Sequence, residues 1–248
     1  MPDPSGHLHL VIPAYHEAER ICPLLEELAE LAEGLNPISV RVVEDSGDGP
    51  EREATLKAIA PIVESSPIFL EPLCDPKNLG KGGAVRSGWN NSPPDATWLG
   101  FLDADGSVSG AEVLRAMKEI RSRESRDIVF FASRVLMLGR NVDRELHRHL
   151  IGRAFATLGS MSLRIKCYDS QCGFKVLPKA AFEKIEPALE VDGFAFDLEL
   201  LAFLVDEGIE IEEFPVDWHE VGGSSVSLIK DPMRMYLALR DIARRRSA

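Results

Sequence analysis

The sequence has no run of about eighteen uncharged apolar residues, the length that a helix needs to cross a bilayer. Its first residues, MPDPSGH, lack the basic and apolar regions of a secretion signal. The four cysteines form no C-x-x-C pair and have no histidine at zinc spacing, which argues against structural zinc. These absences predict a cytoplasmic protein whose thiols stay reduced.

Positive charge is also scarce. The chain carries 28 Lys and Arg residues against 40 Asp and Glu residues, for a net charge of -12. Nucleic-acid binding needs a basic surface, so we expect no nucleic-acid partner. With 248 residues, 45% of them hydrophobic, the chain can bury a sizeable core. We find no repeat or linker and expect a single domain over residues 1–248.

Strands and helices alternate through the first half. Apolar or β-branched segments predict strands at 8–14, 38–44, 68–72, 97–105 and 127–133. Helical spacing predicts helices at about 21–32, 51–60 and 110–122, with another after NLGKGG. This alternation predicts an α/β fold with a mostly parallel central sheet flanked by helices, whose ligands bind at the carboxyl ends of the strands.

The second half is less regular. Helices are predicted near 146–163, at 194–207 and from 229, and a strand at 209–218. Between them lies the polar string DSQCGFK at 169–175. A buried strand would not place Asp169, Ser170 and Gln171 in a row without partners. We expect this half to complete the site of the first.

Asp103 and Asp105 stand two apart at the end of a predicted strand, where side chains i and i+2 point the same way. Two carboxylates aimed together repel each other unless a cation lies between them. Mg²⁺ or Mn²⁺ suits such hard oxygen ligands and commonly bridges to substrate phosphates. The alternative is an acidic loop that caps the helix predicted at 110.

The glycine-rich string NLGKGGAVRSG follows another strand. It is not the dinucleotide fingerprint, because Val85 stands where the third glycine belongs, and it is not a P-loop, because Gly82 follows Gly80-Lys81. A glycine-rich turn before a helix can offer N–H groups to an anion. It can equally be a loop that needs positive φ angles.

Taken in order, the strings V-I-P-A-Y-x-E, an Asp-rich turn, N-x-G-K-G-x-A-x-R-x-G, D-A-D, D-x-Q-C-G-F-K and F-A-F-D-x-E-L-L resemble glycosyltransferase family 2. The resemblance covers about residues 8–225 and is strongest to the dolichyl-phosphate glucose and mannose synthase branch, with a glucose-type look. It implies a GT-A type, Rossmann-like fold with a nucleotide-sugar-binding half at 8–132, an acceptor-side half at 133–228 and a C-terminal amphipathic helix at 229–248.

The resemblance also implies roles for single residues. Those carried over to the nucleotide-sugar donor are Pro13, Tyr15, Glu17, Asp45, Lys81, Arg86 and Asp103. Mg²⁺ or Mn²⁺ would lie on Asp103, Asp105 and Gln171, and catalysis would involve Asp103, Asp105, Arg134 and Lys175. One departure is the turn V-E-D-S-G-D-G-P at 43–50, apparently one residue shorter than the family's V-D-D-G-S-x-D-G-T, which leaves the base open between UDP and GDP. We expect UDP-glucose to be the preferred donor.

Family members invert the anomeric centre in a single displacement. A phosphate monoester acceptor, such as a polyprenyl phosphate, is largely ionised at pH 7 and is its own nucleophile. An alcohol acceptor would need a carboxylate base, with Asp197 and Glu199 as candidates, although both can be structural charges at a helix start. Candidate acceptor arginines are Arg134, Arg144, Arg148 and Arg153, which can equally form a solvated face.

Two other classes remain as alternatives. Sugar-nucleotide pyrophosphorylases carry a glycine-rich loop after the first strand, where this chain has PAYHEAE. A regulator with a decayed site is disfavoured because Asp103, Asp105 and Gln171 are all present.

The last helix has two interpretations. Met235, Tyr236, Leu239, Ile242 and Ala243 recur at helical spacing, and four arginines gather at its end, namely Arg240, Arg244, Arg245 and Arg246. The pattern fits a helix that contacts the inner face of an anionic membrane. It also fits an apolar stripe packed on the sheet.

Overall fold

The computed structural model describes residues 6–122, 128–135, 142–143, 163, 165, 167–221 and 230–246. A seven-stranded sheet runs through both halves of the chain in the order β3-β2-β1-β4-β7-β5-β8. Its strand pairs are parallel except those of β7, which runs antiparallel to both β4 and β5. The mostly parallel α/β sheet expected from the sequence is confirmed.

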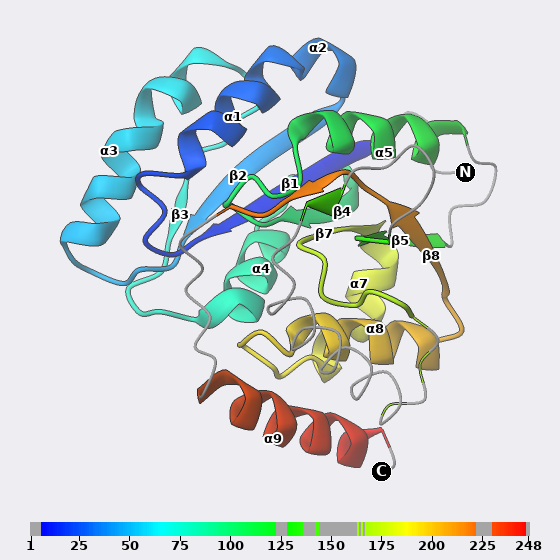
Figure 1. Cartoon of the computed structure of the whole chain (residues 1–248). Coiled ribbons are helices and arrows are strands. Elements are labelled where there is room, and N and C mark those ends of the chain that lie inside the picture. Colours follow the sequence, from blue (N-terminus) through cyan, green and yellow to red (C-terminus); the bar gives the residue numbers. More distant parts are fainter. Residues whose placement is uncertain are drawn as a thin grey trace.

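The first half of the chain contributes five of the seven strands of this sheet, β1 to β5 (Figure 1). Its elements in chain order are β1 (His7–Ala14), α1 (Ile21–Glu30), α2 (Ala32–Leu35), β2 (Ile38–Glu44), α3 (Pro50–Ser65), β3 (Leu73–Cys74), α4 (Gly80–Asn90), β4 (Ala96–Leu102), α5 (Gly110–Ser122) and β5 (Ile128–Ser133).

The second half adds the reversed strand β7 and, beside α4, further helices on the opposite face of the sheet. Its described elements are β6 (Val142–Asp143), β7 (Phe174–Pro178), α7 (Lys179–Ile185), a 3₁₀ turn (Glu186–Ala188), α8 (Phe196–Asp206), β8 (Glu210–Pro215), β9 (Trp218–His219) and α9 (Lys230–Arg245). β6 and β9 form a separate two-stranded parallel sheet.

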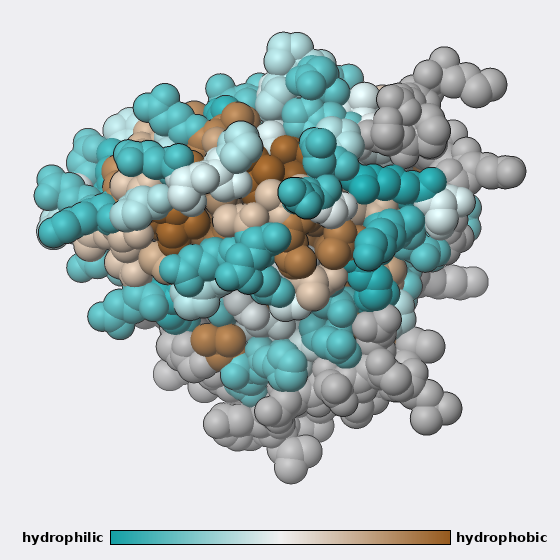
Figure 2. All heavy atoms as spheres, turned by 90° about the horizontal axis from the view of Figure 1, so that it is seen from above, coloured by the Kyte–Doolittle hydropathy of each residue, from teal (hydrophilic) through white to brown (hydrophobic). Residues whose placement is uncertain are grey.

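Alternation along the strands sends side chains to two cores. In β1, Leu8, Leu10 and Ile12 pack with α1, α3 and α5, whereas Val11 packs with the opposite layer of α4, α7 and α8. The helices of the first layer turn polar side chains outward, and Figure 2, which looks onto that face, shows a mainly hydrophilic surface with small hydrophobic patches. Packing on both faces fixes the sheet, and the carboxyl ends of its parallel strands are thereby held in place.

Some expected boundaries were wrong. The predicted strand 209–218 divides after Pro215 into β8 and β9, and α3 continues to Ser65, beyond the expected end near 60. The short β3 begins at Leu73, after the expected strand 68–72, and β7 begins inside the polar string, at Phe174. The helix expected near 146–163 falls almost wholly outside the described residues.

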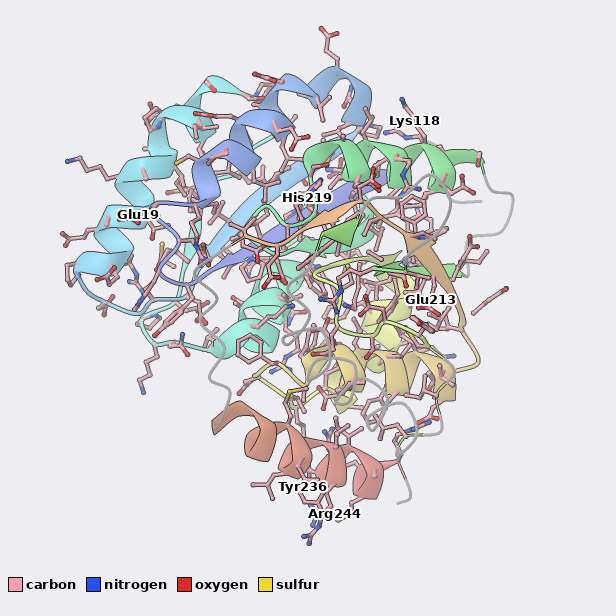
Figure 3. The ribbon with its side chains drawn as sticks, in the orientation of Figure 1. Glu19, Lys118, Glu213, His219, Tyr236 and Arg244 are labelled. Atoms are coloured by element: carbon pink, nitrogen blue, oxygen red, sulfur yellow. The ribbon has the colours of Figure 1, made fainter. Side chains whose placement is uncertain are left out.

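The C-terminal helix packs on α8 with a narrower stripe than the sequence suggested. Leu239 and Ile242 are buried, and Met235 and Ala243 pack beside them, but Tyr236 is 59% exposed and belongs to the outer face. Figure 3 shows Tyr236 and Arg244 pointing away from the body of the protein. Within the described part of the chain, no helix combines the length and hydrophobicity needed to cross a membrane.

Candidate active site

Asp103 and Asp105 follow β4 at the carboxyl edge of the sheet. Asp105 Oδ1 accepts the backbone N–H of Ser107 at 2.9 Å, which closes the loop on itself. The loop does not cap the next helix, because Glu27 of α1 accepts the N–H groups of Gly110 and Ala111 at 2.8 and 3.0 Å. The helix-capping alternative for this acidic loop is therefore wrong.

The polar string of the second half returns to the same place. The backbone N–H of Asp103 donates to the carbonyl of Gly173 at 2.8 Å. A Cβ at position 173 would lie 2.1 Å from Oδ2 of Asp103, so only glycine fits beside this carboxylate. The expectation that the second half completes the site holds for this segment.

Four alternating charges lead inward from Asp103. Lys81 Nζ lies 2.9 Å from Oδ1 of Asp103 and 3.4 Å from Oδ2 of Asp197. The other oxygen of Asp197, Oδ1, contacts Lys175 Nζ at 2.6 Å. We call Asp103, Lys81, Asp197 and Lys175 the charge chain.

The inner end of the charge chain is closed to solvent. Lys175 has no exposed surface, and its Nζ also donates to the carbonyl of Cys172 at 2.6 Å. The Nζ atoms of Lys175 and Lys81 lie 5.0 and 4.9 Å from the ring centroid of Phe101. Lys175 is therefore closed to solvent and contacts Asp197, and its predicted part in catalysis stays a prediction.

Ion pairing keeps Lys81 charged. Burial alone would lower the pKa of Lys81, but the carboxylates of Asp103 and Asp197 raise it above its ordinary value. The pKa of Asp103 is raised, first by burial and then by Asp105, with Lys81 opposing. At the edge of the site, the charged ammonium group of Lys81 therefore lies next to the carboxylate of Asp103, which is stabilised by a positive neighbour.

The glycine-rich segment is fixed by two acceptors from other parts of the chain. The carboxylate of Asp45 accepts the N–H groups of Leu79 and Gly80, at 2.5 and 2.8 Å. The carbonyl of Asp192 accepts those of Gly82 and Gly83, at 2.6 and 3.3 Å. In this conformation these four N–H groups at the start of α4 are not available to an anion, and Gly80 has the positive φ, +76°, that the alternative interpretation requires.

Asp45 and Arg86 consequently have structural partners in this conformation. Burial raises the pKa of Asp45 to about 6, against the two backbone hydrogen bonds that it accepts. Arg86 donates to the carbonyl of Val191 at 2.8 Å and to the carboxylate of Asp192. Their predicted contacts with the nucleotide stay predictions.

Three predicted donor residues lie at and after the end of β1. Pro13 is partly buried within the strand, and Tyr15 is 42% exposed with its ring stacked on His16 at 4.0 Å. Glu17 is buried and pairs with Arg20 at 2.6 Å. Burial raises the pKa of Glu17, and the charges of Asp105 and Asp103 add to the rise, which places Glu17 in the same electrostatic environment.

Arg134 follows β5 and is held by the polar string. Its Nε and one terminal nitrogen each donate to Asp169 at 2.7 Å, and its backbone N–H donates at 2.9 Å. Gln171 donates its backbone N–H to the same carboxylate at 3.3 Å, and its side-chain nitrogen is buried without a hydrogen-bond partner among the described residues. Arg148 and Arg153, like Arg144, lie outside the described residues.

Glu199 lies on the other side of α8 and is fully buried. Its oxygens accept the backbone N–H groups of Glu190 and Val191, at 3.0 and 2.9 Å, and an N–H of Arg245 from α9. Glu199 therefore joins the 190–191 loop to the C-terminal helix, and the prediction that it could serve as an acceptor base is wrong for this conformation.

Known proteins are similar to this chain in sequence and in fold. The model of glycosyl transferase family 2 matches residues 9–186. The dolichyl-phosphate beta-glucosyltransferase of Saccharomyces cerevisiae is 30% identical, over 94% of this chain and 73% of its own length. The dolichyl-phosphate beta-glucosyltransferase of Homo sapiens is 26% identical, over 90% of this chain and 70% of its own.

The chain is a family 2 glycosyltransferase. The pyrophosphorylase and regulator alternatives are thereby set aside. The fold is GT-A: glucosyl-3-phosphoglycerate synthase from Mycobacterium tuberculosis in complex with UDP matches with a TM-score of 0.70 and 14% identity, covering 96% of this chain and 80% of that one. A second structure of that synthase holds Mn²⁺, UDP and glucosyl-3-phosphoglycerate, with a TM-score of 0.66, 13% identity and coverage of 96% of this chain and 78% of that one.

The residues of this glycosyltransferase fit a divalent cation through their chemistry. Asp103 and Asp105 supply hard carboxylate oxygens at the edge where Glu17 adds further negative charge and has one buried oxygen without a hydrogen-bond partner among the described residues. In the described part of the chain, three or more His, Cys, Asp or Glu side chains nowhere converge as a preformed metal cage.

Sequence reasoning missed several residues of the glycosyltransferase site. Phe101, two residues before Asp103, forms the aromatic contact for both lysines, and a β-strand period of two would have pointed to it. Asp192 and Glu27 act through contacts distant in sequence, which no local pattern reveals. His219 donates its backbone N–H to the carbonyl of Ser107 at 3.0 Å, and this brings an exposed histidine to the acidic loop.

Proposed function

We propose that this enzyme transfers glucose from UDP-glucose to dolichyl phosphate or a related polyprenyl phosphate, with Mg²⁺ or Mn²⁺ and inversion at the anomeric carbon. The names of its relatives support glucose and dolichyl phosphate, and the UDP-bound synthases that share its fold support the nucleotide. GDP-mannose is the alternative donor.

One observation carries the choice of acceptor. The two carboxylates that could serve as bases for an alcohol are both buried and paired: Asp197 lies between two lysines, and Glu199 accepts two backbone N–H groups and Arg245. A carboxylate that is closed to solvent and already paired on both oxygens is not placed to take a proton from an acceptor hydroxyl. An acceptor that is already ionised, such as a phosphate monoester, does not need one.

The reaction follows from that acceptor. A phosphate oxygen of the acceptor attacks C1 of glucose from the face opposite the diphosphate, the bond between C1 and the diphosphate oxygen breaks, and UDP leaves with the electron pair. Asp103 and Asp105 would hold the cation, which neutralises the departing diphosphate. Lys81 stands beside Asp103 and supplies a second positive charge on that side.

Gln171 and His219 lie near the same loop and are further candidates to hold the cation. An amide oxygen and an imidazole nitrogen are both common metal ligands. Arg134, positioned by Asp169, is the described arginine that we propose to attract the acceptor phosphate through its positive charge. The same role for Arg148 and Arg153 stays a prediction.

The outer face of α9 is proposed to contact the anionic membrane that presents the lipid. Tyr236 and Leu237 are 59% and 54% exposed, and the exposed arginines Arg240 and Arg244 lie beside them. Arg245 and Arg246 do not belong to this face, because they pair with Glu199 and Asp206 of α8.

A panel of donors and acceptors tests the function. We expect a glucolipid from UDP-glucose and a polyprenyl phosphate with Mn²⁺, little product from GDP-mannose, and none from the matched polyprenol, which lacks the phosphate. Transfer to the polyprenol or to 3-phosphoglycerate, with none to the polyprenyl phosphate, would replace the lipid-phosphate acceptor with a hydroxyl acceptor.

A further inference from the structure

Lys81 binds the carboxylate that the proposed cation would use. Its Nζ lies 2.9 Å from Oδ1 and 3.3 Å from Oδ2 of Asp103, so it contacts both oxygens at once. A chelating cation would need those same oxygens. Lys81 and a cation on both oxygens of Asp103 therefore exclude each other.

Asp197 gives Lys81 a second anchor. Oδ2 of Asp197 lies 3.4 Å from Lys81 Nζ, while Oδ1 is taken by Lys175. Because the two lysines use different oxygens, Lys81 can leave Asp103 without leaving Asp197. Asp197 is 1% exposed in the first turn of α8, so the surrounding core holds its carboxylate in place.

The charges of the empty site balance within the charge chain. The charge chain as it stands has two carboxylates and two ammonium groups, and it is neutral. A divalent cation on Asp103 and Asp105 repels Lys81, and a nucleotide diphosphate brings negative charge to the same edge. The displaced ammonium group then meets a phosphate in place of Asp103.

We propose that Lys81 stands in for the divalent cation at Asp103 while the site is empty, and that it moves to the donor diphosphate when the cation and the donor bind, with Asp197 as its pivot. This rests on the metal dependence of the proposed function. Asp197 and Lys175 are positioning residues in this scheme, since neither touches the substrate.

The substitution Lys81→Met tests the competition directly. Methionine keeps the aliphatic stem, and Asp197 keeps Lys175 as its partner. We expect Mn²⁺ without nucleotide to bind the variant roughly tenfold more tightly than the wild type, because Mn²⁺ no longer competes with an ammonium group. Electron paramagnetic resonance of free Mn²⁺ measures this without any turnover.

The coupling between Mn²⁺ and UDP separates a moving lysine from a stationary one. In the wild type, UDP draws Lys81 away from Asp103 and thereby strengthens Mn²⁺ binding. We expect the ratio of Mn²⁺ affinities with and without UDP to fall roughly tenfold in Lys81→Met. A lysine that stays in place would change both affinities by the same factor, and an unchanged ratio would overturn the movement.

A matched variant controls for the loss of one charge. Lys184 is 57% exposed on α7 and pairs with Glu207, so Lys184→Met removes the same charge away from the site. We expect its Mn²⁺ affinity to match that of the wild type. If Lys81→Met binds Mn²⁺ no more tightly than Lys184→Met, Lys81 does not compete with the cation and the inference fails.

The pivot is tested by a change that leaves net charge unaltered. Asp197→Asn alone would strand the buried Lys175, which can prevent folding. The double variant Asp197→Asn/Lys175→Met removes both charges together. Lys81 then interacts with Asp103 alone, so we expect Mn²⁺ without nucleotide to bind roughly threefold more weakly, opposite in sign to Lys81→Met. Unchanged or tighter binding would remove Asp197 from the scheme.

The inference and the proposed function can fail separately. A wild type that binds UDP equally well with and without Mn²⁺ would overturn the metal dependence and the movement of Lys81 with it. A wild type in which Mn²⁺ and UDP strengthen each other, combined with a Lys81→Met variant that behaves like the wild type, would overturn the movement alone.

Discussion

Asp103 and Gly173 are in direct contact although they come from opposite halves of the chain. The backbone N–H of Asp103 donates to the carbonyl of Gly173, and the Asp103 side chain lies against the glycine Cα where a Cβ would otherwise stand. The contact fixes the carboxylate that the charge chain and the proposed cation share. Gly173 therefore determines where the Asp103 carboxylate lies, although it has no side chain of its own.

We predict that Gly173→Ala lowers kcat/KM about a hundredfold. The new Cβ would push the Asp103 carboxylate out of its position, and a small displacement of a group in an active site can lower the rate by this factor. Gly193→Ala is the matched control, since nothing lies within 4 Å of a Cβ there. Glucosyl transfer and thermal melting of both variants check this. Equal kcat/KM in the two folded variants would show that the contact is not required.

We predict that Asp105→Asn loses metal-dependent turnover while the fold survives, because the change removes one carboxylate charge from the edge of the site rather than from a core. Turnover as a function of Mn²⁺ concentration, together with a melting curve, measures both effects. Full activity at ordinary metal concentration would remove Asp105 from the metal site.

The same titration compares Gln171→Ala with His219→Ala. A neutral ligand contributes less charge than a carboxylate, so we expect a milder rise in the Mn²⁺ concentration needed for half-maximal turnover. The variant that shows the rise identifies the further ligand of the cation. A residue whose loss leaves the titration unchanged serves only to shape the loop.

Much of this site could be predicted from strand ends. Asp103 and Lys81 each follow a strand of the parallel part of the sheet, and because such strands end at one edge, the two side chains can meet in an ion pair. The motif order gave the family, which the family model confirms. These predictions needed only the position of a residue relative to its own strand.

The contacts of other residues could not be predicted from local sequence patterns. Asp197 and Glu199 looked equivalent as bases, but residues two apart on a helix point to different sides. One therefore joins the charge chain and the other binds α9. That distinction was available from the sequence, whereas the capture of Gly82 by Asp192, from another part of the chain, was not.

The ion pair between Asp169 and Arg134 should make the stability of the folded protein depend on pH in the acid range. Burial alone would raise the pKa of Asp169, but the hydrogen bonds and charge of Arg134 lower it to about 2. A carboxylate with a depressed pKa in the folded state stabilises the protein above its unfolded pKa of about 3.9, and this contribution, roughly 2 kcal/mol, is lost as the pH falls toward 2.

We therefore predict that Asp169→Asn is less stable than the wild type at pH 7 and that the difference narrows below about pH 4. Urea unfolding at a series of pH values measures it. Asp48→Asn, at a residue whose side chain is 76% exposed, is the control and should follow the wild type. A gap between Asp169→Asn and the wild type that stays constant into acid would contradict the assignment.

The outer face of α9 gives a prediction about membranes. We expect the double variant Tyr236→Ser/Leu237→Ser to sediment less with anionic liposomes than the wild type, while it keeps its UDP affinity, because both side chains point outward. Truncation after Ala243 is a poorer test, since it also removes Arg245 and Arg246, which tie α9 to α8. Wild-type protein that ignores anionic liposomes at low salt would leave α9 with a packing role only.

The reversed strand β7 has a consequence for how the enzyme is assembled. β4 and β5 are not neighbours in the sheet, because β7 lies between them and pairs with both. A fragment that ended after β5 would lack the strand that joins these two, along with Gly173 and Lys175, although it would contain β1 to β5. During synthesis, the acidic loop can therefore take its final form only after residues 174–178 have emerged from the ribosome. The two halves of the chain therefore form one folding unit, and neither can be transferred as a module without the other.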